Sequence, residues 1–255
     1  MTHRRILRRV LILLALLVTL PLLASGVSVA TQEHPHWSAS RWDSTGLAPD
    51  PAITPDAVVQ VYAARLWGWR GVFAVHTWIV AKPAGARQYT RYEVVGWGRP
   101  ALRVSNRIPD GYWAGNPPAL LRDIRGPAAA ALIPRIAAAA AGYADREDYI
   151  TWPGPNSNSF TAHVARELPE LGLQLPPTAI GKDWLGTGRL LAPAPSGTGW
   201  QVSLFGLAGV TVAMREGLEL NLLGLTIGID ILHPAVKLPG LGRLGLPLAP
   251  GETTG

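Results

Sequence analysis

The sequence of 255 residues contains no cysteine. Disulfide bonds, cysteine-ligated zinc sites and thiol nucleophiles are therefore excluded together. The absence also argues against a lipoprotein, because no cysteine is present to carry the lipid. It is compatible with an oxidising compartment outside the cytoplasm without proving one.

Charged side chains are scarce, at 16% of the sequence, and they form no basic stripe. The formal net charge is +6, but four of the positive charges are arginines within the first nine residues, and taking these four away leaves +2 for the rest of the chain. A nearly neutral domain has no electrostatic footprint for a phosphate backbone. We therefore expect no nucleic-acid partner.

Motifs for a metal or a cofactor are lacking as well. His34, His36 and Asp43 lie in a polar segment without further ligands at a fixed spacing. The glycine-rich segments 224–228 and 240–245 lack the lysine of a P-loop and the strand-to-helix context of a dinucleotide-binding motif. We expect no metal and no cofactor.

The longest hydrophobic run lies near the N-terminus. Residues 10–30 carry no charged side chain, and four arginines precede them: Arg4, Arg5, Arg8 and Arg9. A helix that spans a bilayer needs roughly 20 apolar residues, and basic residues before the span favour a cytoplasmic N-terminus. We expect a signal anchor at residues 1–30 that tethers the chain to a bacterial inner membrane, with the domain in the periplasm or at the cell exterior.

A cleaved signal peptide is the alternative for this segment. Small residues at 24–26 and 28–30 have the spacing of a cleavage site, and Pro21 could end the hydrophobic region. Cleavage would make the domain a secreted protein. Either interpretation places the domain on the far side of the membrane.

The remaining residues have the composition of one folded domain. Residues 31–55 are polar and contain proline, as a linker does, and residues 249–255 form a tail. Roughly 220 residues after the anchor are enough for one well-buried core. We expect a single α+β domain at residues 56–248.

Apolar patterns and turn residues predict the elements of this domain. Residues 57–65 fit a short helix or a strand. A hairpin is expected with strands at 71–81 and 89–97 and its turn at 82–87. Helices are expected at residues 119–141, where Pro134 kinks the helix or starts a second one, and at 159–168.

The C-terminal part alternates short apolar runs with glycine, which indicates an antiparallel β-meander. Its strands are expected at residues 200–205, 210–214, 218–222 and 225–229. Charges are sparse there, so this sheet is either covered by the rest of the domain or docked on the membrane.

A helix start at residues 154–160 is the first candidate for chemistry. A Gly-Pro turn, then Asn and Ser residues, then an apolar run from Phe160 predict a capped amphipathic helix. Ser157 or Asn158 can act as the cap. The same helix N-terminus favours negative charge, so it also fits an oxyanion site in which Ser157 is the nucleophile and Asn156 and Asn158 lie beside it.

His76, in an apolar predicted strand, is the second candidate. A lone histidine in such a strand is more often a core residue than a catalyst. A histidine that faces a nucleophile at a helix start can act as a general base, and Glu93 on the adjoining strand is the candidate to orient it. Glu93 could instead be a surface carboxylate paired with Arg91, and the strand register could offer Tyr92 in its place.

Ten tryptophans accompany these residues, and several cluster in sequence around the predicted site. Indole faces stack well on sugar rings and lipid chains. Trp67 and Trp152 are the candidates for substrate binding. Core packing would explain them equally well.

Several segments together resemble the bacterial domain of unknown function 3750 family. The resemblance covers about residues 40–245 and implies no established activity. Its segments are Val58 to Arg65, Trp67 to Gly71, Val75 to Trp78, Arg91 to Gly98, Trp152 to Phe160 and Thr178 to Asp183.

A looser resemblance is to circularly permuted papain-like domains of the NlpC-like and lecithin retinol acyltransferase-like kind. Their nucleophile opens a helix in the pattern Asn-Cys-x-x-Phe, and residues 156–160 match this pattern with Ser157 at the cysteine position. The resemblance implies a permuted papain-like core in which His76 precedes the nucleophile. A hydroxyl cannot be ionised by the helix field near neutral pH, so Ser157 would need His76 as a true general base, or the site has kept only a binding groove.

Three functions follow from these patterns. The first is hydrolysis or acyl transfer on a peptidoglycan peptide or a lipid, in which Ser157 attacks, His76 takes the proton and Glu93 orients the imidazole. The second is a catalytically inactive module that binds a glycan, peptide or lipid in the same groove. The third is a structural partner of a membrane complex that uses the apolar C-terminal sheet.

Overall fold

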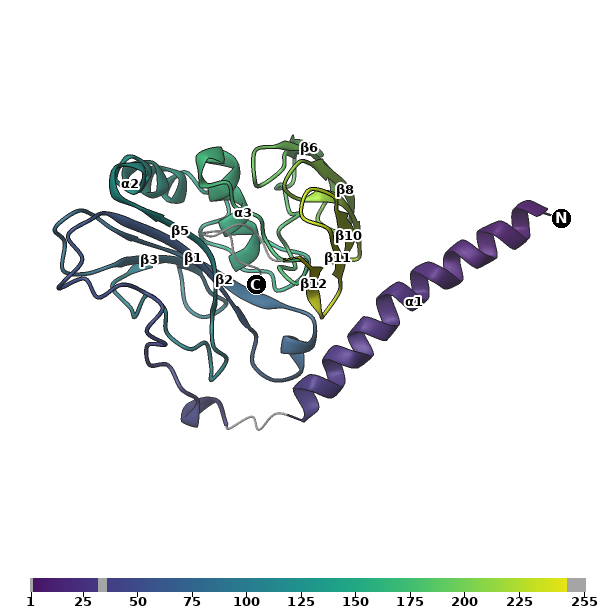
Figure 1. Cartoon of the computed structure of the whole chain (residues 1–255), viewed down its shortest axis with the longest axis horizontal. Helices are drawn as coiled ribbons and strands as arrows, with labels where there is room; N and C mark the ends of the chain where they lie inside the picture. The colour runs from purple at the N-terminus through teal and green to yellow at the C-terminus, as the bar shows by residue number, and fades with distance from the viewer. Residues whose placement is uncertain (1, 32–35, 247–255) are drawn as a thin grey trace.

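The computed structural model describes residues 2–31 and 36–246. Two antiparallel sheets and two helices form the body of the protein, and a long N-terminal helix projects from it (Figure 1). This is an α+β fold, as expected. The helices are α1 Thr2–Ala30, α2 Gly126–Ala141 and α3 Ser157–Glu167, with short 3-10 turns η1 Trp37–Ala39, η2 Gly68–Val72 and η3 Pro169–Leu171.

The strands fall into two groups along the chain. The first sheet has the order β4-β3-β2-β1-β5, and the second is a seven-stranded meander in sequence order from β6 to β12. The strands are β1 Val58–Arg65, β2 Val75–Lys82, β3 Thr90–Val94, β4 Leu102–Ser105, β5 Ala119–Arg125, β6 Leu191–Pro193, β7 Gly199–Leu204, β8 Ala208–Ala213, β9 Gly217–Leu222, β10 Leu225–Asp230, β11 Ala235–Leu238 and β12 Gly242–Gly245.

The first sheet is covered on both faces, which explains why its central strands are buried along their whole length. One face packs on α2 and α3, where Ile79 of β2 shares a core with Ile136 and Phe160. On the other face, Trp78 packs with Tyr62 and Trp113. Because side chains alternate along a strand, neighbouring residues of β2 belong to different cores.

Most predicted elements are confirmed, with one correction, and two open alternatives are decided. Residues 119–125 are a strand, not the start of a helix, because β5 pairs with the free edge of β1. Pro134 lies within a single helix, α2, and Gly142 ends it. The stretch 57–65, left open between helix and strand, is strand β1.

Part of the predicted linker packs on the domain. Asp110 is buried, and its carboxylate accepts hydrogen bonds from Ser44 Oγ and from the backbone N–H groups of Leu47 and Ala48. Trp42 packs edge-on against Trp113. Residues 42–48 therefore help to cover the Trp78 face of the first sheet. His34 and the tail 249–255 lie outside the described residues.

The second sheet meets the rest of the domain through a buried polar network. Glu219 of β9 lies 2.7 Å from Lys182 and 2.5 Å from Lys237 of β11. Although burial alone would raise it, the pKa of Glu219 is lowered by these two lysines. Asp183 accepts hydrogen bonds from Gln201 and Asn221, so every charge in the network has a partner.

Helix α1 is long and apolar enough to cross a membrane, with a mean hydropathy of 2.6 in its most apolar stretch. Its C-terminal part contacts η2, β10 and β11. Ser25 is buried there, and its hydroxyl donates to the carbonyl of Val72 at 2.9 Å. The Arg65 guanidinium donates to Ser25 Oγ and to the carbonyls of Gly71 and Gly240. The end of α1 is thus held against the domain.

Candidate functional site

His76 and Glu93 are brought together as expected. His76 Nε2 lies 2.9 Å from Glu93 Oε2, and both side chains are buried. The same carboxylate oxygen accepts a hydrogen bond of 2.7 Å from Arg91. The imidazole also stacks on the Trp113 ring, with 3.6 Å between the ring centroids. The stacking fixes the plane of the imidazole, and the Glu93 contact fixes which edge faces the carboxylate.

The protonation of this pair follows from its surroundings. Burial lowers the pKa of His76, which outweighs the raising effect of the Glu93 hydrogen bond. Burial also acts to raise the pKa of Glu93, but the hydrogen bonds and charges of His76 and Arg91 bring it down to about 2. Near neutral pH an ionised Glu93 therefore accepts from Nε2–H of a neutral imidazole, which leaves the lone pair on Nδ1.

Tyr92 cannot take the place of Glu93. Along β3, Arg91 and Glu93 face the His76 side of the sheet, while Tyr92 belongs to the core that packs on α2 and α3. The alternation of side chains along the strand thus selects the carboxylate as the orienting group.

A cavity of about 340 Å³ borders His76. Trp67, Trp97 and Trp113 form much of its wall, and Arg70 contributes a cation. Glu93 Oε1 lacks a hydrogen-bond partner among the described residues, and a guanidinium nitrogen of Arg107 lies 3.6 Å from it. We call this space the histidine cavity.

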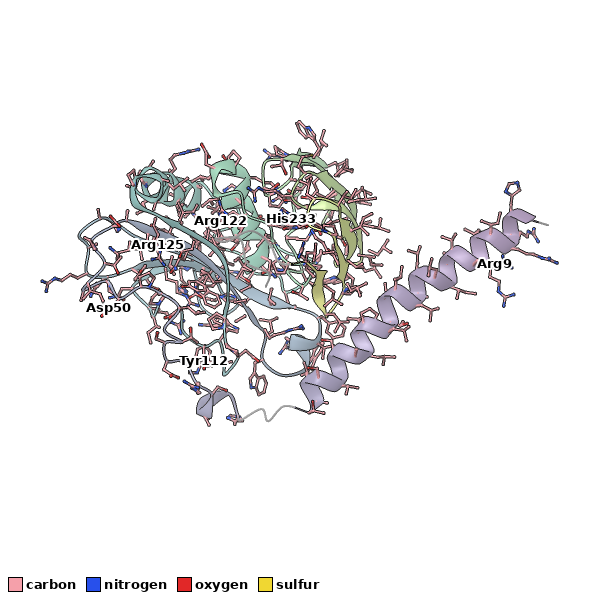
Figure 2. All side chains as sticks on the ribbon, viewed as in Figure 1. Arg9, Asp50, Tyr112, Arg122, Arg125 and His233 are labelled. Atoms are coloured by element: carbon pink, nitrogen blue, oxygen red, sulfur yellow. The ribbon has the colours of Figure 1, made fainter. Side chains whose placement is uncertain are left out.

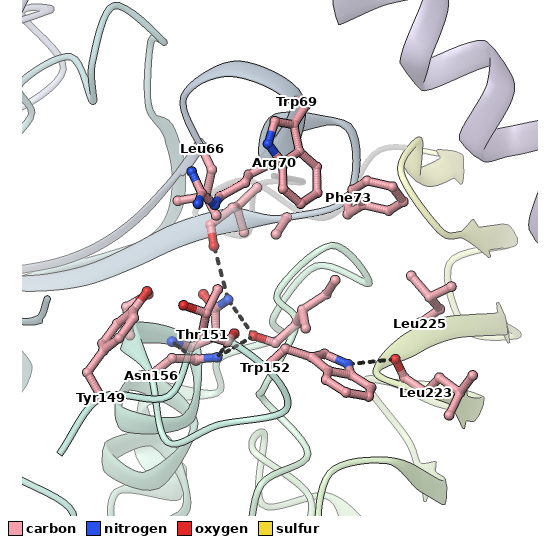
Figure 3. A pocket seen from close by; sticks show the side chains of 15 residues that line it. Leu66, Trp69, Arg70, Phe73, Tyr149, Thr151, Trp152, Asn156, Leu223 and Leu225 are labelled. Carbon is pink, nitrogen blue, oxygen red and sulfur yellow. Dashed lines mark hydrogen bonds between the residues drawn. The ribbon is translucent and has the colours of Figure 1, made fainter. Parts of the chain in front are cut away.

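A second, mostly apolar cavity of about 330 Å³ lies beside it. Figure 3 shows Trp69 and Phe73 on one side of this space and Trp152, Leu223 and Leu225 on the other. We call it the apolar cavity. The two cavities share four wall residues, so they are neighbouring lobes of one cleft: Leu66, Arg70, Tyr149 and Thr151.

The start of α3 lines the apolar cavity, but its polar groups are largely occupied. Asn156, not Ser157 or Asn158, is the cap: its Oδ1 accepts from the backbone N–H groups of Asn158 and Ser159. Its Nδ2 donates to the carbonyls of Thr151 and Ile180. Asn158 Nδ2 donates to the carbonyls of Val75 and Ile180. The cap thus takes two of the N–H groups that an oxyanion site at this helix start would use.

Ser157 and His76 are not brought together. Thr77 Oγ1 lies 2.9 Å from Thr161 Oγ1 and 3.0 Å from Asn158 Oδ1, so Thr77 faces α3. His76, the preceding residue, points to the opposite face of β2. Within residues 2–31 and 36–246, no hydrogen bond joins Ser157 Oγ to His76. Ser157 lines the apolar cavity, and His76 lines the other lobe.

The two predicted tryptophans lie in different lobes. Trp67 lines the histidine cavity. Trp152 lines the apolar cavity, is half exposed, and donates from Nε1 to the carbonyl of Leu223 at 2.9 Å. Trp152 therefore links the loop before α3 to the turn between β9 and β10.

Three residues of the site were not predicted as its members. Arg91 fixes the charge of Glu93, Arg107 lies near its free oxygen, and Trp113 stacks on His76. The pairing of Glu93 with Arg91 was expected only as a surface alternative; the structure has this pair buried, on the His76 face where strand alternation places both residues. Trp113 comes from a loop without periodicity, and nothing in the sequence indicates its contact.

Together these observations define an α+β domain with a two-lobed cleft, a buried histidine–glutamate pair in one lobe, and an apolar helix ahead of the domain. Residues 56–184 match the model of the family described as Protein of unknown function (DUF3750). The match covers half of the chain, which belongs to this family. It ends before β6, so the second sheet lies outside the matched part. Searches among curated proteins and solved structures gave no match. The resemblance to permuted papain-like domains stays a prediction.

Proposed function

We propose that this protein is anchored in a membrane by α1 and holds the acyl chain of a lipid in its cleft. The observation that carries this proposal is the apolar cavity, whose size lies within the usual range for small-molecule sites, about 300–1,000 Å³. Its rim is open to ligands, since Trp69 is 68% and Leu223 66% exposed. An apolar chain is the occupant that such a wall stabilises.

The position of α1 supports a retained anchor over a cleaved signal peptide. Ser25 holds the end of α1 on the domain through part-buried hydrogen bonds to the Val72 carbonyl and to Arg65, and cleavage that removes Ser25 would break both. Helix α1 also contacts η2, the turn that carries Trp69 of the apolar cavity. With the four arginines at the start of α1 on the cytoplasmic side, the cleft would lie at the outer surface of the membrane, in the periplasm or at the cell exterior.

The cavity chemistry favours a lipid over a peptidoglycan peptide. A peptide backbone needs hydrogen-bond partners along its length, since unpaired polar groups are costly when buried. The side-chain amides of Asn156 and Asn158 are already bonded within the protein. The histidine cavity, with Arg70 and three indoles, offers the polar and aromatic contacts that suit a head group.

Photo-crosslinking tests the proposal. The full chain is placed in liposomes that contain a phospholipid with a diazirine in its acyl chain, and the labelled peptides are identified. We expect labelling of residues 66–75. Ala74→Trp fills the apolar cavity and should abolish this labelling, whereas Ala52→Trp, at an exposed loop position, should keep it. Absence of labelling in wild type, or equal labelling in Ala74→Trp, would contradict lipid binding in the cleft.

Acyl-group chemistry is the second candidate, and the His76–Glu93 pair favours it. Nδ1 can take a proton from a hydroxyl in the histidine cavity as its oxygen attacks an ester carbonyl, and the imidazolium can return that proton to the leaving alkoxide. Glu93 would stabilise the imidazolium, as a carboxylate does in a catalytic triad. Since Ser157 lies on the other face of β2, water or a substrate hydroxyl is a better reactant than Ser157.

Hydrolysis of a short-chain fluorogenic ester by the full chain in liposomes tests this second candidate. Loss of a general base typically lowers the rate by about 10²–10⁴-fold, so we expect a drop of that order in His76→Gln. Arg87→Gln, at the exposed turn between β2 and β3, serves as the matched control. Equal rates in wild type and His76→Gln would contradict catalysis by His76 and leave binding as the remaining role. Loss in Ser157→Ala would restore Ser157 as the nucleophile.

A further inference from the structure

The side chains on the outer face of the second sheet are apolar. One row crosses six strands in register, and each member is 44% to 61% exposed: Trp200, Val212, Leu218, Ile229, Val236 and Leu244. Val202, Val210 and Leu220 continue the same pattern in the next row. An antiparallel sheet of a soluble protein has the reverse arrangement, with its apolar face on the core.

The polar residues of the inner face explain why the two faces of the sheet cannot exchange places. Gln201, Glu219 and Lys237 alternate with the outer residues, and all three are buried. A shift of one residue in register would move these groups outward and break the contacts of Glu219 with Lys182 and Lys237. The apolar face therefore stays outside, although a contiguous apolar surface of this kind is unusual on a soluble monomer.

Helix α1 indicates that a membrane, not another part of this chain, covers this face. It is long and apolar enough to span a bilayer, and it contacts β10 and β11 of the same sheet. Figure 2 shows outward side chains of the sheet on the side of the body toward α1. The apolar surface also reaches the cleft, because Leu223 and Leu225, at the turn between β9 and β10, line the apolar cavity.

We propose that the outer face of the β6–β12 sheet rests in the acyl-chain region of the leaflet next to the domain, so that the protein contacts the membrane through a sheet as well as through α1. Among the described residues, β6 and β12 are the edge strands of this sheet, and the outer backbone groups of an edge strand cannot enter hydrocarbon without partners. The sheet therefore lies on the leaflet and does not span it. This contact holds whether or not the cleft binds a lipid.

Site-specific fluorescence tests the contact, since a chain without cysteine accepts a single introduced label. Val212→Cys places an environment-sensitive dye in the outer row. Gln88→Cys is the matched control, because it is exposed at the turn between β2 and β3, at the opposite end of β2 from η2. Both full-length variants are placed in liposomes that contain phospholipid with nitroxide on the acyl chain, and their thermal unfolding is compared with that of wild type.

We expect the dye at position 212 to lose most of its emission and to resist aqueous iodide. The dye at position 88 should keep its emission and be quenched by iodide. If iodide quenched both dyes and the nitroxide lipid quenched neither, the proposal would be overturned. A dye at position 212 that resists both quenchers would also overturn it and assign the face to protein, with disulfide formation between Val212→Cys chains identifying a second copy. Lipid binding in the cleft is unaffected by any of these outcomes.

Discussion

The pairing of His76 with Glu93 links stability to pH because both groups are buried. Burial lowers the pKa of His76 below its ordinary value of 6.5, so the folded protein holds the imidazole neutral. Despite burial, the pKa of Glu93 falls to about 2 through His76 and Arg91. In both cases the unfolded chain binds protons more readily than the folded one, so acid destabilises the fold.

We expect the free energy of unfolding to fall in two pH windows. The His76 contribution is present above about pH 6.5 and declines as the pH drops below that value. The Glu93 contribution is present above about pH 4.5 and is lost as the pH falls toward 2. The lowering of the Glu93 pKa from 4.5 to about 2 corresponds to roughly 3 kcal/mol of stability at neutral pH. Urea denaturation of the full chain in detergent at pH 7, 5 and 3 measures both windows.

Glu93→Gln isolates the lower window. This variant should be less stable than wild type at pH 7 and pH 5, because Arg91 stays buried without its carboxylate. It should also lose less stability than wild type between pH 5 and pH 3. Glu147→Gln, which changes an exposed carboxylate, is the control and should follow wild type. An unchanged pH dependence in Glu93→Gln would show that Glu93 is protonated or unpaired in the folded protein.

The sequence allows the His76–Glu93 contact to be predicted, because a hairpin brings their two strands together. It does not tell which face of β2 meets α3. His76 and Thr77 are neighbours, and the choice between them depends on the contacts of Thr77 with Asn158 and Thr161, residues about 80 positions away. The predicted contact between Ser157 and His76 depended on that choice.

At the scale of elements, β9 shows how the second sheet is held. Leu218, Leu220 and Leu222 point outward, while Glu219 and Asn221 enter the buried network with Lys182 and Asp183. The usual assignment of polar residues to the surface is reversed along this strand. Sequence alternation alone predicts the strand but not which side is inside, because that depends on partners for the charges.

Two adjacent residues of β9 test this reversal. Glu219→Gln removes the carboxylate that pairs with buried Lys237 and one of the two that pair with Lys182, which keeps Asp183, and breaking a buried pair typically costs about 3–5 kcal/mol. Leu218→Ala changes an exposed side chain, and substitutions of that kind usually change stability by no more than about 0.5 kcal/mol. Urea denaturation in detergent should therefore rank Glu219→Gln well below Leu218→Ala in stability. The opposite order would show that Leu218 is the residue inside.

The corrected strand β5 has a comparable cause. Residues 119–125 lead directly into α2, so composition alone extends the helix backward through them. In the structure, β1 needs a partner on its second edge, and β5 supplies it with a register shift between Val61 and Tyr62. Pairing between distant segments outweighs local helix propensity here.

At the scale of the whole molecule, three apolar features lie on one side of the body. They are the exposed helix α1, the second sheet, which lies on the side of the body toward α1 (Figure 1) and has exposed apolar side chains, and the apolar cavity, which is lined by Trp69 of η2 and by Leu223 and Leu225 near the β9–β10 turn. The turn between β2 and β3, residues 83–89, lies at the end of β2 opposite η2. In the proposed function, this arrangement would let a membrane lipid reach the cleft directly.

Native mass spectrometry of the full chain, released from lipid nanodiscs, tests lipid binding in the cleft most directly. We predict one retained phospholipid per chain in wild type and in Ala52→Trp, and none in Ala74→Trp, whose indole occupies the apolar cavity. A wild-type chain that leaves the nanodisc without lipid, or an equal retention of lipid in Ala74→Trp, would contradict the account.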